Sequence, residues 1–288
     1  MPLSWSRHLK ISRRRLLKGA AVTAGLSLAT GYYTWQIEPH WLQIVERDLP
    51  IAHLPSSLQG ARLAQLSDLH IGHQVDDSYL LETFARVRAI APDIVVYTGD
   101  FTTESRDTID HAGRMFPHLP LGSRATFGIL GNHDYGSGWS ETSVADNLAV
   151  LAQSVGVQML RNETREVDGL QVMGLDDLWS GLFDVQKAIA ATDLSRPAIA
   201  ITHNPDTADE PGWGDYSGWI LAGHTHGGQC KPPFLPPPML PVKNRRYTSG
   251  EFELSDGRRM YINRGVGHLL QVRFNARPEV TLFQLTRA

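Results

Sequence analysis

The sequence predicts an α/β fold, because short apolar runs alternate along the chain with longer amphipathic stretches. Runs with the length and composition of buried strands occupy residues 61–67, 94–99, 127–131, 198–202 and 219–223. Between these runs, residues 77–90 and 141–155 place apolar side chains at helical spacing. In folds of this class, ligands bind at the carboxyl ends of the strands.

The last third of the chain changes character at a proline-rich segment. Residues 231–241 (KPPFLPPPMLP) exclude a helix or a central strand, because proline lacks the N–H donor and fixes the backbone. The three runs that follow, residues 248–254, 260–263 and 280–285, are typical of antiparallel strands. The sequence contains no internal repeat and no low-complexity linker, so we expect one domain after the amino-terminal segment.

Composition excludes several classes of protein. Hydrophobic residues make up 42% and charged residues 20% of the 288 residues, which excludes a disordered, collagenous or polytopic membrane chain. The single cysteine, Cys230, excludes an internal disulfide framework and a zinc site made of cysteines alone. Residues 1–37 hold six Lys and Arg residues and no acid, so the rest of the chain is acidic. An acidic body argues against nucleic-acid binding and suits a protein that holds metal cations.

The amino-terminal segment has the order of an export signal, with basic residues followed by the small and apolar residues 19–33. Residues 12–18 (SRRRLLK) resemble a twin-arginine export motif, whereas the alternative is an ordinary basic surface segment. We therefore expect the twin-arginine export machinery as a partner. The expected location is the periplasm or the outer face of the cytoplasmic membrane.

The fate of residues 1–37 stays open between a cleaved signal and a membrane anchor. Residues 27–29 (SLA) form a small-x-small cleavage site. Residues 19–37 are long enough to span a bilayer core of about 30 Å, and Tyr32 and Trp35 suit its outer interface. An uncleaved anchor would hold the protein at the membrane.

Polar residues of metal-binding type end each predicted strand. Asp68 and His70 follow the first strand, and in extended backbone residues i and i+2 face the same side, so both side chains can reach one cation. The other strands end in Gly99-Asp100, Gly131-Asn132-His133-Asp134, Thr202-His203 and Gly223-His224-Thr225-His226. Each glycine lets the backbone turn sharply and leaves room for an ion or phosphate. The mixture of imidazole, carboxylate and amide suits zinc, manganese or iron, and disfavours calcium or magnesium alone.

These motifs, in this order, resemble those of the calcineurin-like metallophosphoesterases. The strings at residues 67–72 (SDLHIG) and 223–229 (GHTHGGQ) are similar to the exported YkuE/YaeI-type phosphodiesterase branch, as are residues 263–265 (NRG) and 278–280 (PEV). The resemblance covers about residues 45–288. It implies a metallophosphoesterase catalytic domain folded as a four-layer αββα sandwich, with a two-metal site.

The ligand set that the resemblance implies comprises Asp68, His70 and His226 for one metal, Asn132, His203 and His224 for the other, and Asp100 as the bridge between them. A hydroxide that bridges the two metals would attack phosphorus in line with the leaving oxygen. His133 adjoins a ligand without being one, and it is the candidate catalytic residue that stabilises the transition state or protonates the leaving alkoxide. The alternative for His133 is a hydrogen-bonding role behind the ligands.

One position departs from the family pattern. Many relatives carry an acid three residues after the bridging aspartate, where it orients the catalytic histidine. This chain has Thr103 there, so the candidates to replace that acid are Asp134 and Glu104.

For the residues around the motifs, an ordinary structural role is expected or is one of two alternatives. We expect His73 and His268 to be solvated loop residues. Arg264 has two readings, a phosphate ligand or a structural salt bridge. The cluster Lys243, Arg245 and Arg246 is read as a solvated face or an approach for an anion, and residues 234–240 as a rigid loop or an apolar wall for a lipid-like substrate.

Together these observations favour an exported two-metal phosphoesterase, and more narrowly a phosphodiesterase. An enzymatic alternative is a membrane-associated pyrophosphatase that acts on a nucleotide-linked acylated sugar. A non-enzymatic alternative is an exported metal-binding protein of the cell envelope. The substrate is a phosphoester that the sequence does not specify further, lipid- and nucleotide-linked esters included.

Overall fold

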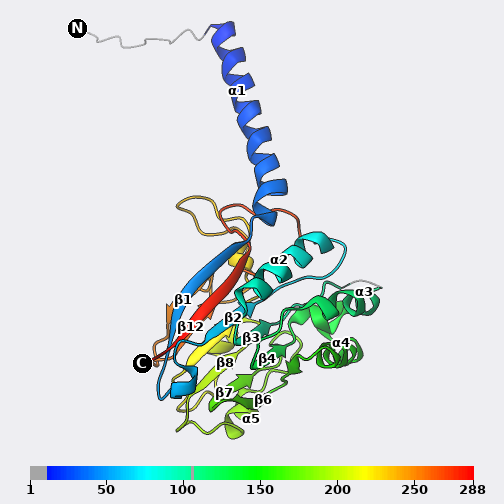
Figure 1. The fold of residues 1–288 in the computed structure, drawn as a ribbon. Coiled ribbons are helices and arrows are strands. Elements are labelled where there is room, and N and C mark those ends of the chain that lie inside the picture. The colour runs from blue at the N-terminus through cyan, green and yellow to red at the C-terminus, as the bar shows by residue number, and fades with distance from the viewer. Residues whose placement is uncertain (1–11, 105–106) are drawn as a thin grey trace, which may run out of the picture.

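Two six-stranded mixed sheets form the centre of the protein (Figure 1) in a computed structural model that describes residues 12–104 and 107–288. The first sheet has the order β1 (Gln43–Ile51), β12 (Glu279–Arg287), β2 (Arg62–Leu66), β3 (Ile94–Thr98), β4 (Ala125–Ile129) and β5 (Gln158–Met159). The second has the order β10 (Gly250–Glu253), β11 (Arg259–Ile262), β9 (Trp219–Ala222), β8 (Ala198–Ile201), β7 (Leu170–Gly174) and β6 (Glu163–Val167). In each sheet, the inner strands that precede the predicted motifs run parallel.

Three hydrophobic cores divide the protein into four layers. One core lies between the sheets and takes side chains from both, such as Val96 of β3 and Ile201 of β8. Side chains alternate in direction along a strand, so Val95, the neighbour of Val96, enters the core beneath the helices. Because a core covers each face, the central strands are buried on both faces. This alternation explains why the central strands are continuous apolar runs in the sequence.

Helices cover the outer face of each sheet. The first sheet is covered by α2 (Asp77–Ile90), α3 (Thr108–Met115) and α4 (Thr142–Ser154). The second is covered by α5 (Val185–Ala190) and the turn Pro205–Asp209, which pack with Trp213 and Tyr216. The predicted four-layer αββα sandwich is therefore confirmed.

The prediction of strands from apolar runs misses β1, β5, β6 and β7. β1 carries charged residues and Pro50, as edge strands often do. β7 is wholly buried, but Gln171 interrupts its apolar run. The amide of Gln171 exchanges two hydrogen bonds with the backbone of Asp193, at 2.8 and 2.9 Å, and this exchange satisfies the buried polar group.

The prediction of antiparallel strands in the last third is correct in part. β10 and β11 pair antiparallel, but β11 is parallel to its other neighbour, β9. β12 is antiparallel to β2 and parallel to β1. An apolar run indicates a strand, whereas its direction depends on which neighbours the tertiary fold provides.

The helix α1 (Arg13–Tyr32) extends away from the sandwich (Figure 1). Ser12 caps it, since the Ser12 hydroxyl accepts the N–H of Arg15. Within the described part of the chain, the structure has no helix that combines the length and the apolar character needed to cross a membrane. Arg7 and Lys10 of the predicted signal lie outside the described residues.

Candidate metal centre

The seven predicted ligands come together at the carboxyl ends of the strands, where the two sheets meet. The first sheet contributes Asp68 and His70 after β2, Asp100 after β3 and Asn132 after β4; the second contributes His203 after β8 and His224 and His226 after β9. All seven are buried. The site therefore forms only when both sheets are stacked, with most of the oxygen donors on one sheet and most of the imidazoles on the other.

The first group of donors is Asp68, His70 and His226, whose ligand atoms lie close enough to hold one ion. The Nε2 atoms of His70 and His226 are 3.1 Å apart. The Nε2 atom of His226 lies 3.4 Å from Oδ1 of Asp68. This is the set of three residues predicted for one metal.

The second group is Asp100, His203 and His224. The Nε2 atom of His203 lies 3.1 Å from Oδ2 of Asp100 and 3.0 Å from Nδ1 of His224. The other nitrogens of the two rings donate to backbone carbonyls, those of Thr98 and Pro241, each at 2.8 Å. In neutral rings the facing nitrogens therefore carry lone pairs. Two ring nitrogens and a carboxylate oxygen thus converge, with Nε2 of His203 3.0–3.1 Å from each of the other two atoms, so the donor set fits a metal ion.

Asn132 supports the same conclusion. Both polar atoms of its side chain are buried and have no hydrogen-bond partner among the described residues, and an unsatisfied buried polar group costs about 1–3 kcal/mol. A metal ion would satisfy the amide oxygen. Asp100 has the position of a bridge, because Oδ2 lies 3.1 Å from Nε2 of His203 in one group and 3.7 Å from Nε2 of His70 in the other.

Backbone strain is concentrated at the donors. Five of the seven have positive φ angles: Asp68, His70, Asp100, His224 and His226. Such angles are uncommon outside glycine and cluster at functional sites. The expectation that Asp68 and His70 lie in extended backbone is therefore wrong, since both are left-handed. Their side chains meet because the chain turns at each residue.

Two glycines allow the backbones to approach this closely. A Cβ atom on Gly131 would collide with Oδ1 of Asp100, and one on Gly223 would lie 2.6 Å from Oδ2 of Asp68. Both positions therefore require glycine, and the room that it leaves is taken by the carboxylates of two predicted ligands.

Burial and mutual charge set the protonation of the donors. Burial alone would lower the pKa of His203, but the carboxylate of Asp100 outweighs it and raises that pKa to about 10. Burial would raise the pKa of Asp100, but the charge of His203 holds it well below its ordinary value. Burial lowers the pKa values of His70 and His224 to about 3. At neutral pH the metal-free centre thus holds His203 as an imidazolium, next to ionised Asp100 and the neutral imidazoles of His70 and His224.

Thr103 and Asp134 support the site in ways that the sequence did not indicate. The Thr103 hydroxyl lies 3.2 Å from Nδ1 of His70, so this position contacts a predicted ligand and not His133. Asp134 accepts the backbone N–H groups of Phe101, Thr102 and Gly131 at 2.9–3.1 Å. Its carboxylate therefore ties the ends of β3 and β4 together and is already occupied by these donors.

His133 lies beside both groups without belonging to either. Its backbone N–H donates to Oδ1 of Asp100 at 3.0 Å, which fixes its position. Its half-buried ring stands edge-on to the ring of His70, with a centroid distance of 5.3 Å. The imidazole faces the cavity described next.

A cavity of about 930 Å³ opens over the donors, with Asp100, His133, His224 and His226 among its lining residues. Trp139 and Trp179 form one wall, with stacked rings whose centroids are 4.7 Å apart, and Trp179 stands edge-on to His224 at a centroid distance of 4.5 Å. Apolar side chains form much of the remaining wall, namely Met239, Leu240, Leu269, Leu270 and Val272, with Gln229 and Arg245 among the polar lining residues. The predicted apolar wall is present in residues 238–241 of the proline-rich segment.

Sequence reasoning missed the two tryptophans, residues 269–272 and Arg273. Arg273 is fully buried and donates to the carbonyls of Gly267 at 2.6 Å and Ala276 at 2.7 Å. The Gly267 N–H in turn donates to the Asp68 carbonyl at 2.7 Å. Arg273 thus holds the segment that supports Asp68, and a lone arginine in a loop gives no sequence signal for this role.

For the residues around the site, the structure agrees with some predictions and corrects others. His73 is exposed and lies 3.0 Å from Asp107. His268 is fully buried, so the expectation of a solvated loop residue is wrong: its Nε2 lies 2.9 Å from the carbonyl of Gln74, in the loop before α2. Arg264 pairs with Glu279 at 2.6 Å, which favours the structural salt bridge.

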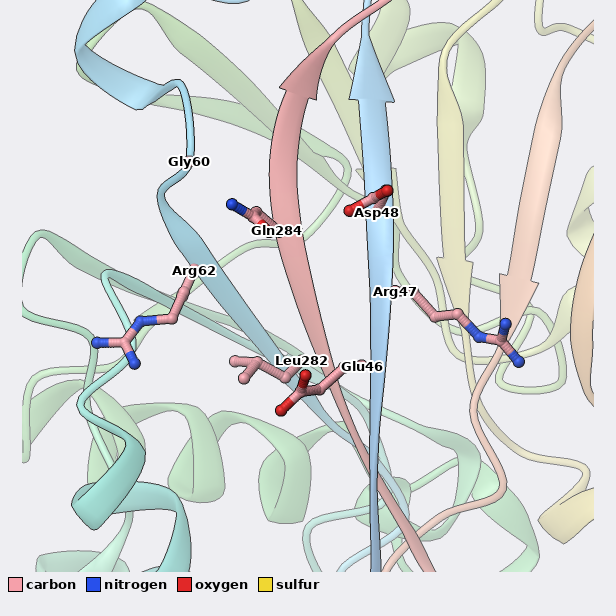
Figure 2. Close-up of a pocket in the computed structure, with 7 residues that line it drawn as sticks. All are labelled: Glu46, Arg47, Asp48, Gly60, Arg62, Leu282 and Gln284. Atoms are coloured by element: carbon pink, nitrogen blue, oxygen red, sulfur yellow. The ribbon is translucent and has the colours of Figure 1, made fainter.

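A second cavity, of about 520 Å³, lies along β1, β12 and β2 (Figure 2). Its lining consists of Glu46, Arg47, Asp48, Gly60, Arg62, Leu282 and Gln284. Figure 2 shows these residues along the strands and the loop before β2, and none of them belongs to the strand-end motifs. Charges of both signs line it, so it favours no single class of ligand.

The fold and the donor set are those of one class of protein. Sequence comparison identifies this class directly. The calcineurin-like phosphoesterase family matches residues 61–228, and the chain belongs to this family. The predicted family is therefore confirmed.

Three relatives match nearly the whole chain. It is 33% identical over 290 residues to the uncharacterized metallophosphoesterase YkuE of Bacillus subtilis, with 96% of this chain and 98% of that protein covered. It is 31% identical to the phosphodiesterase YaeI of Escherichia coli, with 96% and 99% covered. It is 28% identical to the UDP-2,3-diacylglucosamine pyrophosphatase LpxG of Chlamydia trachomatis, with 91% and 97% covered.

Proposed function

We propose that this calcineurin-like phosphoesterase is a phosphodiesterase that works with two divalent cations, one held by each group of donors and both contacted by Asp100. The observation that carries the proposal is the pair of buried donor groups, with ring nitrogens 3.0–3.1 Å apart in each, at the floor of an open cavity. The mixture of nitrogen and oxygen donors favours manganese, zinc or iron. A relative named as a phosphodiesterase, 31% identical over almost its full length, supports the diester preference.

When bound, the cation pair would supply Lewis acidity and a nucleophile that is active at neutral pH. The protein's own residues supply position and proton transfer. Asp100 fixes both groups relative to each other, and its Oδ1 holds the backbone of His133. The His133 imidazole faces the cavity, where it can donate to a phosphoryl oxygen or to the leaving alkoxide. Trp139 and Trp179 shield one side of the reacting group from water.

A second candidate substrate class is favoured by the cavity wall. Met239, Leu270 and Val272 give the cavity an apolar lining of a kind that suits an acyl chain more than a free nucleotide. A relative of 28% identity is named as a pyrophosphatase of UDP-2,3-diacylglucosamine. The alternative activity is therefore hydrolysis of a pyrophosphate in a nucleotide-linked acylated sugar.

We also propose export by the twin-arginine route, with the catalytic body in the periplasm or on the outer face of the cytoplasmic membrane. The basis is the sequence of residues 12–18 and the unburied helix α1 that begins within it. Replacing Arg13 and Arg14 with lysine keeps the charge but removes the arginine pair, so the variant is expected to stay in the cytoplasmic fraction. Equal export of the variant and the unmodified chain would refute this route.

The test of the activity compares a chromogenic phosphodiester with the matching monoester, using the full chain loaded with manganese or zinc. We expect faster turnover of the diester, loss of turnover on chelation, and a rate reduced about 10²–10³-fold in His133→Ala with the metal content unchanged. Full activity in His133→Ala would overturn its catalytic role. No turnover of either ester or of an acylated pyrophosphate, with two ions per chain, would favour the non-enzymatic metal-binding alternative.

A further inference from the structure

We propose that the mouth of the cavity is a docking surface for a phospholipid bilayer that contains anionic lipids. The surface, called the mouth rim below, consists of Phe234, Leu235, Met239, Leu270 and Val272. The inference rests on the proposed function in one respect only, namely that the cavity behind the rim is the active site.

The mouth rim exposes large apolar side chains to an unusual degree. Phe234 is fully exposed, Met239 is 72% exposed, and Leu235 and Leu270 are each 62% exposed. Single exposed apolar residues need no explanation, but a contiguous group around a cavity marks an interaction site. Phe234, Leu235 and Met239 belong to residues 231–241, where the prolines restrict the backbone.

Hydrogen bonds join the two segments of the rim into one surface. The backbone N–H of Lys231 donates to the Phe274 carbonyl at 2.8 Å, and that of Phe274 donates to the Gln229 carbonyl at 2.9 Å. The Gln229 side chain donates to the Leu270 carbonyl at 2.9 Å. Met239, Leu270 and Val272 also line the cavity, so the exposed surface continues into the proposed active site.

The helical turn Tyr33–Ile37, which continues α1, contacts the segment that carries Leu270 and Val272. The Arg273 N–H donates to the Thr34 carbonyl at 2.9 Å, and the Gln271 side chain donates to the Trp35 carbonyl at 3.1 Å. Trp35 and Trp41 are 52% and 50% exposed at this end. Exposed tryptophans favour the interface between water and lipid. Figure 1 shows that α1 rises from this end of the molecule, whereas α5 lies at the opposite end.

Basic side chains flank the mouth rim and indicate that the bilayer contains anionic lipids. Lys243, Arg245 and Arg246 are exposed, and Arg245 donates to the Pro237 carbonyl at 2.8 Å, which ties the cluster to the proline-rich segment. The nearby carboxylate of Asp206 is buried and accepts the backbone N–H of Lys243 at 2.6 Å, so it leaves the basic side chains free to face outward. Apolar anchors beside Lys and Arg are the chemistry of binding to anionic lipid surfaces.

Docking in this orientation turns the cavity toward the membrane. An amphiphilic phosphoester would then reach the floor of the cavity with its acyl part still against apolar side chains. A second copy of the chain or another protein would not require the combination of a wholly exposed phenylalanine, interfacial tryptophans and a basic border. The bilayer is therefore the occupant to which the proposal commits.

The first experiment measures co-sedimentation of the full chain with vesicles of phosphatidylcholine, with and without phosphatidylglycerol. The variant F234S/L235S is expected to bind the vesicles at least about tenfold more weakly, because it loses two apolar side chains that would enter the bilayer. K243Q/R246Q is expected to weaken binding about fivefold per charge, and only to vesicles with phosphatidylglycerol. The matched controls are V150S/L194S and K187Q, which alter exposed residues elsewhere. If F234S/L235S binds the vesicles as well as the unmodified chain does, the proposal is overturned, whether or not the variant also differs in self-association.

A second measurement excludes binding through α1 alone. With Cys230 replaced by serine, an environment-sensitive fluorophore is attached at F234C or, as the control, at V150C. The label at position 234 should shift to shorter wavelength on vesicles with phosphatidylglycerol, and the label at position 150 should not. No shift at position 234 while the chain sediments with vesicles would refute docking of the rim. Neither Phe234 nor Leu235 lines the cavity, so hydrolysis of a soluble diester by F234S/L235S tests the proposed function separately and should be unchanged.

Discussion

The floor and the mouth of the cavity are built in opposite ways. On the floor, none of the seven predicted ligands is more than 6% exposed, and five adopt strained backbone angles. The floor is held by hydrogen bonds from several elements, such as those of Asp134 to three backbone N–H groups. At the mouth, Phe234 and Met239 are largely exposed and belong to a proline-rich segment outside the sheets.

This difference assigns the reaction chemistry to the floor of the cavity and the choice of substrate to its mouth. A rigid, buried floor fixes the donors for the cations, which serve any phosphoester that reaches them. The mouth decides which esters arrive and from which phase. Changes to the floor should therefore affect all substrates alike, and changes to the mouth should affect amphiphilic substrates alone.

The largest expected effect comes from Asp100→Asn on the floor. Asp100 faces both donor groups and lies beside the proton on His203, so the loss of its charge should weaken both cations at once. We expect fewer than two ions per chain by elemental analysis and a loss of activity of at least about 10³-fold on every substrate. Asp168→Asn, in an exposed ion pair with Arg124, is the control. Two retained ions per Asp100→Asn chain would contradict the bridging role.

Arg273→Lys tests the segment between floor and mouth. A lysine cannot span the carbonyls of Gly267 and Ala276 as the guanidinium does. Because unsatisfied buried carbonyls would remain, we expect a decrease of about 3 kcal/mol in the free energy of unfolding, measured by chemical denaturation. Arg47→Lys, on the exposed part of β1, should change little. A stability equal to that of the unmodified chain would show that Arg273 does not hold this segment.

His268→Gln tests the same segment through pH. Burial, with a contribution from the charge of Arg273, lowers the pKa of His268 from 6.5 to about 4. Between these values the unfolded chain binds the proton more readily, so the stability is present above pH 6.5 and is lost as the pH falls toward 4. The unmodified protein should lose about 2 kcal/mol more than His268→Gln between pH 7.5 and pH 5. The exposed His118→Gln is the control, and identical pH profiles of His268→Gln and the unmodified protein would disprove the assignment.

The smallest effect is expected at the mouth, from M239S/L270S. Both side chains line the cavity and are largely exposed, so the variant should fold normally. We expect KM for an acylated phosphodiester to rise about tenfold, equivalent to about 1.4 kcal/mol, with no change for a small chromogenic diester. An equal change for both substrates would show that floor and mouth are not separable.

The parts of this structure that sequence predicts well are those where local chemistry and geometry coincide. The central strands are recognisable because they are buried on both faces, and the donors because they directly follow these strands. Gly131 and Gly223 mark the positions where two backbones approach too closely for a side chain. The four layers came from resemblance and not from these patterns.

The parts that sequence predicts poorly depend on contacts between distant segments. The left-handed backbone at Asp68 and His70 follows from the loop that Arg273 holds beneath it, not from the residues themselves. Trp179 reaches the site from the loop after β7, a strand that Gln171 conceals. His268 has the sequence surroundings of a loop residue, yet it is buried and contacts Gln74 in the loop before α2 and the ring of His40.

Anomalous diffraction from crystals of the full chain grown with manganese tests the central claim most directly. The account predicts two peaks on the cavity floor, one next to Asp68, His70 and His226 and the other next to Asn132, His203 and His224, with Asp100 in contact with both. A single peak, or peaks held by other residues, would contradict the assignment of a two-cation floor.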